Sequence, residues 1–129
     1  MADGAPPFPI APLAPFEGAR PPAPEWFERA MAVEPEVLRA DLGGVGIETL
    51  AWGERGRPGL LLVHGAGGHA GWWRATAPIL AQDYRVAALS LSGMGGSDWR
   101  AGYSFNAYAD ELFAAAEIAG LFDADEKPV

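Results

Sequence analysis

The stretch LLLVHGAGGHAGWW, residues 60–73, joins an apolar run, a histidine, a loop that is nearly bare backbone and two adjacent tryptophans. Residues 60–63 are apolar without alternation, which is typical of a strand covered on both faces. The glycines that follow remove side chains at the carboxyl end of that strand, where α/β sheets bind their ligands. This stretch therefore predicts a site lined by backbone beside a buried strand.

Strands and helices alternate outward from this stretch. Residues 37–42 and 45–52 predict two strands joined at Gly43-Gly44, a turn that tolerates positive φ. Residues 85–91 predict another strand buried on both sides, and Ser104 is a good N-cap for a helix that ends at Gly120. The remaining predicted elements are helices over residues 24–31 and 72–81 and the opening of one more strand at residues 127–129. The apolar stripe expected on the last helix comprises Phe105, Tyr108, Ala109, Leu112, Ala116 and Ala119.

This order predicts an α/β fold in which an N-terminal β-hairpin is followed by β-α-β-α on a mostly parallel sheet. Residues 25–129 would form that domain. Residues 1–24 hold eight of the twelve prolines and predict a disordered Pro/Ala-rich tail. The alternative is a docking arm whose apolar side chains touch the domain, namely Phe8, Ile10, Leu13 and Phe16.

Composition excludes several classes of protein. The chain has 129 residues, enough for one domain, and its net charge of −8 argues against a nucleic-acid partner. It contains no cysteine, and His64 and His69 have no carboxylate close by, so we expect neither a metal site nor a cofactor. With no membrane-spanning apolar run and no signal-peptide pattern, a cytoplasmic protein without a membrane partner is expected.

Three interpretations fit the glycine loop. Its backbone N–H groups could form an oxyanion hole, because main chain without side chains can approach a developing negative charge closely. It could equally be a tight strand-to-helix turn that needs glycine for steric reasons alone. The segment also fits the dinucleotide fingerprint G-x-G-x-x-G/A, but the next strand ends Leu89-Ser90-Leu91-Ser92 without the acidic residue that would hold a ribose. That third interpretation is disfavoured.

Three motifs occur in a characteristic order. They are Leu50-Ala51-Trp52-Gly53, then Leu61-Leu62-Val63-His64-Gly65 followed by Trp72-Trp73, then Tyr84-Arg85-Val86 leading to Ser92-Gly93-Met94-Gly95-Gly96-Ser97. From about Trp26 onward, the chain resembles the N-terminal half of a bacterial α/β-hydrolase-fold protein. Members of this family usually carry His-Gly at the oxyanion loop and D-x-x-G-x-G-x-S after the next strand. Ser90 stands here in place of the usual Asp.

The resemblance implies roles for individual residues. The oxyanion N–H would come from Ala66, with Gly67 as second choice. Of Trp72 and Trp73, one would face the core and one would wall the substrate pocket, or both would serve the core alone. Met94 would lie on the same rim, where simple exposure is favoured over substrate contact. Structural roles in the two loops are implied for His64, Gly65, Gly93, Gly95 and Ser97. The family's epoxide hydrolases and many of its dehalogenases carry a proline soon after His-Gly, and none lies in residues 65–71.

The family's nucleophile sits in a G-x-S-x-G elbow with an acid and a histidine later in the chain. None of the four serines, Ser90, Ser92, Ser97 and Ser104, lies in such an elbow. Neither histidine lies late enough to be the general base. We therefore expect the N-terminal part of a hydrolase of small-molecule esters, lactones, amides or related bonds, ending before the elbow and inactive alone. The alternative is a non-catalytic remnant or interaction module that self-associates through an open sheet edge.

Overall fold

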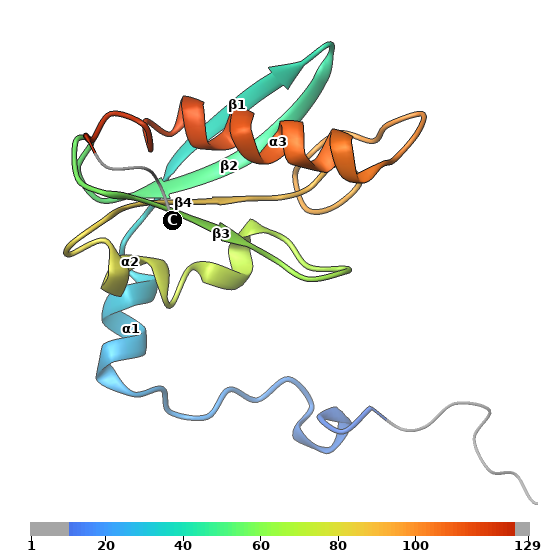
Figure 1. Cartoon of the computed structure of the whole chain (residues 1–129). Helices are drawn as coiled ribbons and strands as arrows, with labels where there is room; N and C mark the ends of the chain where they lie inside the picture. Colours follow the sequence, from blue (N-terminus) through green and yellow to red (C-terminus); the bar gives the residue numbers. More distant parts are fainter. Residues whose placement is uncertain (1–10, 126–129) are drawn as a thin grey trace, which may run out of the picture.

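The computed structural model describes residues 11–125. Within this range the strands form one mixed sheet in the order β1-β2-β4-β3 (Figure 1). The strands are β1 (Glu36–Leu42), β2 (Val45–Trp52), β3 (Gly59–Val63) and β4 (Arg85–Leu89). β3 pairs with β4 in parallel, whereas β1–β2 and β2–β4 are antiparallel. The parallel part of the described sheet is therefore the β3–β4 pair, and β1 and β3 form its two edges.

Helices cover both faces of the sheet. The α-helices are α1 (Glu25–Met31), α2 (Ala77–Leu80) and α3 (Phe105–Ile118), and the 3₁₀ turns are η1 (Ala14–Phe16) and η2 (Ala70–Trp73). α3 lies across one face of all four strands, while η2 and α2 lie on the other (Figure 1). α1 packs against α2.

β4 forms the centre of the core. All of its residues are buried, as the sequence predicts. Val86 and Ala88 belong to a cluster with Ala70 and Ala77 beneath the sheet. Ala87 and Leu89 point to the opposite face, where α3 covers them. This alternation follows from the two-residue period of a strand.

The β1–β2 hairpin has the predicted turn. Leu42 pairs with Val45, so only Gly43 and Gly44 lie between the strands. Both glycines have positive φ, 63° and 90°. A two-residue turn with positive φ at both positions matches the twist of the flanking strands and favours glycine.

Two predicted elements are shorter than expected. The predicted strand 85–91 ends at Leu89, because the N–H of Leu91 donates to the His64 ring and not to a neighbouring strand. The predicted helix 72–81 is wrong as one helix: η2 and α2 replace it. Pro78 lies in the first turn of α2, where its missing N–H costs nothing, and it cannot continue a preceding helix.

Two predictions of burial are also wrong. β3 is half-buried over residues 60–62, and Val63 is 39% exposed, because β3 is an edge strand. On α3, Phe105 is 93% exposed and Ala109 is exposed. The rest of the predicted stripe faces the sheet, with Ala116 and Ala119 buried and Tyr108 and Leu112 half-buried. The helix also buries Glu111 and Ala115, which the predicted stripe does not include. Ser104 is the N-cap as predicted, accepting a hydrogen bond from Ala107 N–H at 3.1 Å.

Residues 11–24, which precede α1, run along a mostly extended path away from the domain (Figure 1). Leu13 and Phe16 are exposed, so these two side chains do not dock on the domain as an arm. The predicted contacts of Phe8 and Ile10 and the predicted strand at residues 127–129 lie outside the described residues.

Candidate functional site

The glycine loop connects the carboxyl end of β3 to η2. Gly68 N–H closes a turn on the carbonyl of Gly65 at 3.0 Å, and Gly67 has a positive φ of 73°. Gly65, Ala66 and Gly67 are exposed. Within residues 11–125 the N–H groups of Ala66 and Gly67 meet no acceptor. The loop can therefore offer two backbone donors to an anion at the carboxyl end of the sheet.

His64 holds the first end of this loop and is buried. Its Nε2 accepts a hydrogen bond from Leu91 N–H at 3.0 Å, so Nε2 carries no proton. The ring proton therefore sits on Nδ1 and is donated to the Gly65 carbonyl at 2.7 Å. Because both ring nitrogens are engaged, the geometry gives His64 a structural contact and leaves no free nitrogen for proton transfer.

The two tryptophans separate as expected. Trp73 packs against the cluster beneath the sheet. Trp72 is exposed and its ring lies 6.5 Å from the His64 ring and 6.4 Å from the His69 ring, centre to centre. Met94 is half-buried in the second glycine-containing loop. The role of Trp72 and Met94 in binding substrate stays a prediction.

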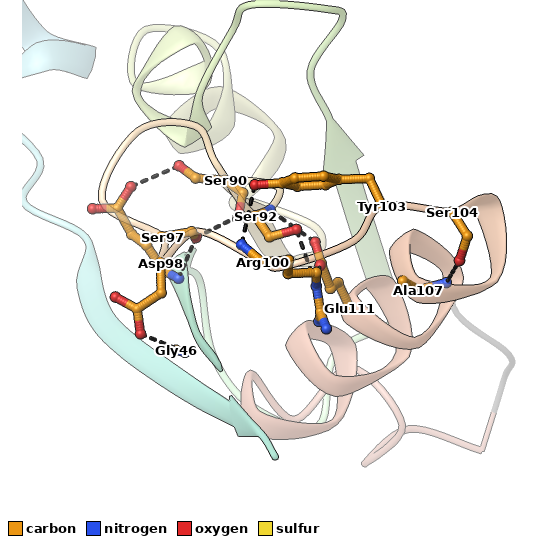
Figure 2. Close-up of polar contacts among 11 residues, drawn as sticks. Gly46, Ser90, Ser92, Ser97, Asp98, Arg100, Tyr103, Ser104, Ala107 and Glu111 are labelled. Atoms are coloured by element: carbon orange, nitrogen blue, oxygen red, sulfur yellow. Dashed lines mark hydrogen bonds and ion pairs between the residues drawn. The ribbon is translucent and has the colours of Figure 1, made fainter. Parts of the chain in front are cut away.

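That second loop, residues 92–98, is fastened through Ser97 and Asp98 (Figure 2). The buried Ser97 hydroxyl donates to the Ser90 carbonyl and accepts from Glu48 N–H. Gly93 and Gly95 have positive φ, and a Cβ on Gly93 would meet the Tyr103 hydroxyl at 2.7 Å. The loop therefore requires glycine at both positions.

Asp98 ties the loop to the hairpin. Its carboxylate accepts from Gly46 N–H at 2.8 Å and pairs with Arg39. The hydrogen bond from Gly46, assisted by Arg39, holds the pKa of Asp98 below its ordinary value of 3.8. At neutral pH this carboxylate is therefore ionised and works as an acceptor.

Sequence reasoning missed a buried ion pair beneath the second loop. Glu111 on α3 is fully buried, accepts from Ser92 N–H at 2.9 Å and pairs with Arg100 Nε at 2.6 Å. Arg100 Nε also lies 3.1 Å from the Ser92 hydroxyl (Figure 2). The available signal was position: Glu111 lies three residues after Tyr108 and four before Ala115, on the face that the helix buries.

The serines of this region make structural contacts. Ser90, Ser92 and Ser97 are buried and hydrogen-bonded through their hydroxyls, and Ser104 caps α3. In the described part of the chain, none of these hydroxyls is hydrogen-bonded to a histidine. Among residues 11–125 there is also no cluster of three potential metal ligands. No helix in this range is long and apolar enough to cross a membrane.

Known proteins are similar to this chain in sequence and in fold. The chain is 36% identical to a fluoroacetate dehalogenase of Burkholderia sp. over 93 residues, which are 67% of this chain and 27% of that protein. Epoxide hydrolase A from Mycobacterium thermoresistibile superposes with a TM-score of 0.62 at 28% identity, covering 72% of this chain and 30% of that one. A thioesterase domain from the curacin biosynthetic pathway gives 0.59 at 28% identity, covering 66% and 33%.

The chain thus spans about a third or less of the length of these relatives. A dehalogenase and an epoxide hydrolase are both among the matches, although no proline lies in residues 65–71 of this chain. The family profile described as the alpha/beta hydrolase family matches residues 60–129, which begin at β3 and include both loops. This 129-residue chain belongs to the alpha/beta hydrolase family.

Proposed function

We propose that this chain supplies the oxyanion-hole side of a hydrolase active site. The observation that carries the proposal is the pair of N–H groups of Ala66 and Gly67, exposed and without an acceptor in residues 11–125, at the carboxyl end of β3. Such donors stabilise negative charge that develops on a substrate oxygen, and one of them typically contributes about 3–4 kcal/mol to lowering the barrier. Ala66 is the first donor and Gly67 the second.

The reaction class is hydrolysis of an ester, lactone, amide or related bond in a small molecule. Membership of the family supports hydrolysis. The similar proteins include a dehalogenase, an epoxide hydrolase and a thioesterase domain, so they support no single substrate. Trp72 would form part of the pocket wall, since its exposed ring lies beside the loop.

The attacking nucleophile and its base would come from outside these 129 residues. The serine hydroxyls are engaged in structural hydrogen bonds, and His64 uses both ring nitrogens. The oxyanion loop cannot form a covalent bond to an acyl group. We expect no turnover of a nitrophenyl ester by the chain alone, and turnover that is abolished by Ser104→Ala would contradict this.

The loop's role is tested by Ala66→Pro in an active enzyme that contains this segment. Proline removes the donor N–H, and Ala66 lacks the positive φ that proline cannot adopt. Turnover should fall by about 10²–10³. Ala66→Gly is the matched control because it keeps the N–H, and it should retain most activity. Unchanged turnover in the proline variant would assign the donor elsewhere.

Self-association through β3 is the second candidate function. Both β1 and β3 are edge strands, but β1 carries the charges of Glu36, Arg39 and Asp41 whereas β3 is Gly-Leu-Leu-Leu-Val. Charged side chains protect an edge from pairing, and an uncharged apolar edge invites it. The supporting observation is thus an unprotected edge with Val63 partly exposed.

Size-exclusion chromatography with light scattering tests this second candidate. The chain should elute as oligomers or be poorly soluble, and Val63→Lys should shift the elution toward the monomer. Val37→Lys on the opposite edge is the matched control, because Val37 is also exposed, and it should leave the distribution unchanged. A sharp monomer peak for the unaltered chain would refute the proposal.

A further inference from the structure

Both ends of the glycine loop are fastened to consecutive residues at the exit of β4. The first end is held where Leu91 N–H donates to His64. The second end is held where Ala70 N–H, at the start of η2, donates to the Ser90 hydroxyl at 3.0 Å. Six residues separate Val63 from Ala70, so these two anchors govern where the loop's N–H groups point.

The Ser90 anchor depends on a third residue. Ser90 is fully buried, and its hydroxyl has one proton to donate while its oxygen accepts from Ala70 N–H. Glu48 on β2 accepts a hydrogen bond from this hydroxyl at 2.7 Å, which directs the lone pairs of the hydroxyl oxygen toward Ala70. Without an acceptor at this place, the hydroxyl proton would be left buried and unpaired, at a cost larger than the net value of one hydrogen bond.

Glu48 also fastens the second loop. The same carboxylate oxygen accepts from Gly96 N–H at 3.2 Å. A Cβ on Gly96 would collide with the Glu48 carboxylate, and one on Gly95 would lie 2.8 Å from the His69 Cβ and collide with the Ser90 hydroxyl. The second loop is therefore packed against the Glu48–Ser90 pair and against the residue that caps η2.

We propose that Glu48 is a positioning residue: acting through Ser90, it sets the orientation of the glycine loop and couples it to the second loop. Glu48 would act on the proposed oxyanion loop, so its role rests on the proposed function. Amide exchange needs no catalytic activity, and the two proposals can therefore fail separately.

The test compares Glu48→Ala, Ser90→Ala and Glu48→Gln in the ¹⁵N-labelled full chain, at a concentration where light scattering gives the monomer mass. Glutamine keeps an acceptor oxygen, so E48Q is the conservative rescue. Exposed Glu54, which pairs with Arg57, provides the control variant Glu54→Ala. The readouts are hydrogen exchange at the Ala70 amide and the amide chemical shifts of Ala66 and Gly67.

In E48A and S90A we expect Ala70 exchange to accelerate about tenfold or more relative to the amides of the β2–β4 ladder, and the Ala66 and Gly67 shifts to move. E48Q and E54A should match the unaltered chain. Three results would each overturn the proposal. They are an Ala70 amide that accelerates no more than the ladder amides, loop shifts that stay unmoved in E48A, and an E48Q variant that behaves like E48A.

Discussion

Replacing Glu111 by alanine should destabilise the fold by about 3 kcal/mol, which is a large part of the 5–15 kcal/mol typical of a domain. Glu111 is fully buried, and its loss leaves Ser92 N–H without its acceptor and the Arg100 guanidinium without its carboxylate partner. Arg100 Nε keeps the Ser92 hydroxyl as an acceptor. Breaking a buried ion pair from one side costs roughly 3–5 kcal/mol. The Arg100 side chain is 16% exposed and can recover part of its hydration, which places this variant at the lower end.

The opposite truncation should cost more. Arg100→Ala leaves the Glu111 carboxylate unpaired at a position with no access to water, so about 5 kcal/mol is expected. Replacing both residues by leucine should cost less than the sum of the single changes, because neither charge is then left alone. The order of the three losses of stability is therefore as informative as their magnitudes.

Urea unfolding followed by circular dichroism at neutral pH measures these differences, again at a concentration where the chain is monomeric. The control is Arg29→Ala, which breaks the exposed Glu25–Arg29 pair on α1 and should cost less than about 1 kcal/mol. If Glu111→Ala were as mild as this control, the pair would contribute nothing to holding the second loop on α3. The reasoning from burial would then be refuted.

Two further predictions concern acid and the second loop. The hydrogen bond from Arg85 holds the pKa of Glu36 below its ordinary value of 4.5, as Gly46 and Arg39 hold the pKa of Asp98 below 3.8. Both carboxylates therefore stabilise the fold fully above pH 4.5, and this contribution is lost as the pH falls through the lowered pKa values. The urea concentration at the unfolding midpoint should therefore fall when the pH is lowered below 4.5, and it should fall less steeply with pH in Glu36→Gln. An equally steep fall in that variant would exclude Glu36 as a cause. Gly95→Ala should lower the thermal midpoint because of its φ of 51° and its contact with Ser90, whereas Gly102→Ala, which has open space, should not; equal effects would contradict the assignment.

Local chemistry made much of this fold predictable. Gly43-Gly44 between two strand patterns is enough to place the Leu42–Val45 register, because a two-residue turn allows few geometries. The unbroken apolar run of β4 correctly indicates a strand covered on both faces. Ser104 before an amphipathic segment predicts the start of α3, since its hydroxyl replaces a missing backbone acceptor.

The errors share a physical cause, which is tertiary contact. β3 has the same apolar pattern as β4, but its place at the sheet edge leaves it half-buried. The predicted apolar stripe of α3 does not include Glu111, because a charged side chain is costly to bury without a partner. Its partner Arg100 lies in a loop, and no periodicity of the sequence predicts the path of that loop. The contact of Glu48 with Ser90 depends on β2 lying next to β4, which the sequence of one strand does not reveal.

An open sheet edge and a pair of backbone donors without acceptors lie at the same place in the described fold. β3 is an unprotected edge strand, and the glycine loop with its free N–H groups leaves from the carboxyl end of that strand. A strand that pairs in parallel with β3 would fill the edge, and because parallel strands end on the same side of a sheet, its carboxyl end would come to lie beside Ala66 and Gly67. A nucleophile placed there would face the proposed donors directly. A second copy of this chain would fill the edge without bringing a nucleophile, since its serines and His64 make the same structural contacts. Self-association and catalysis would therefore compete for one edge, and Val63→Lys should weaken both.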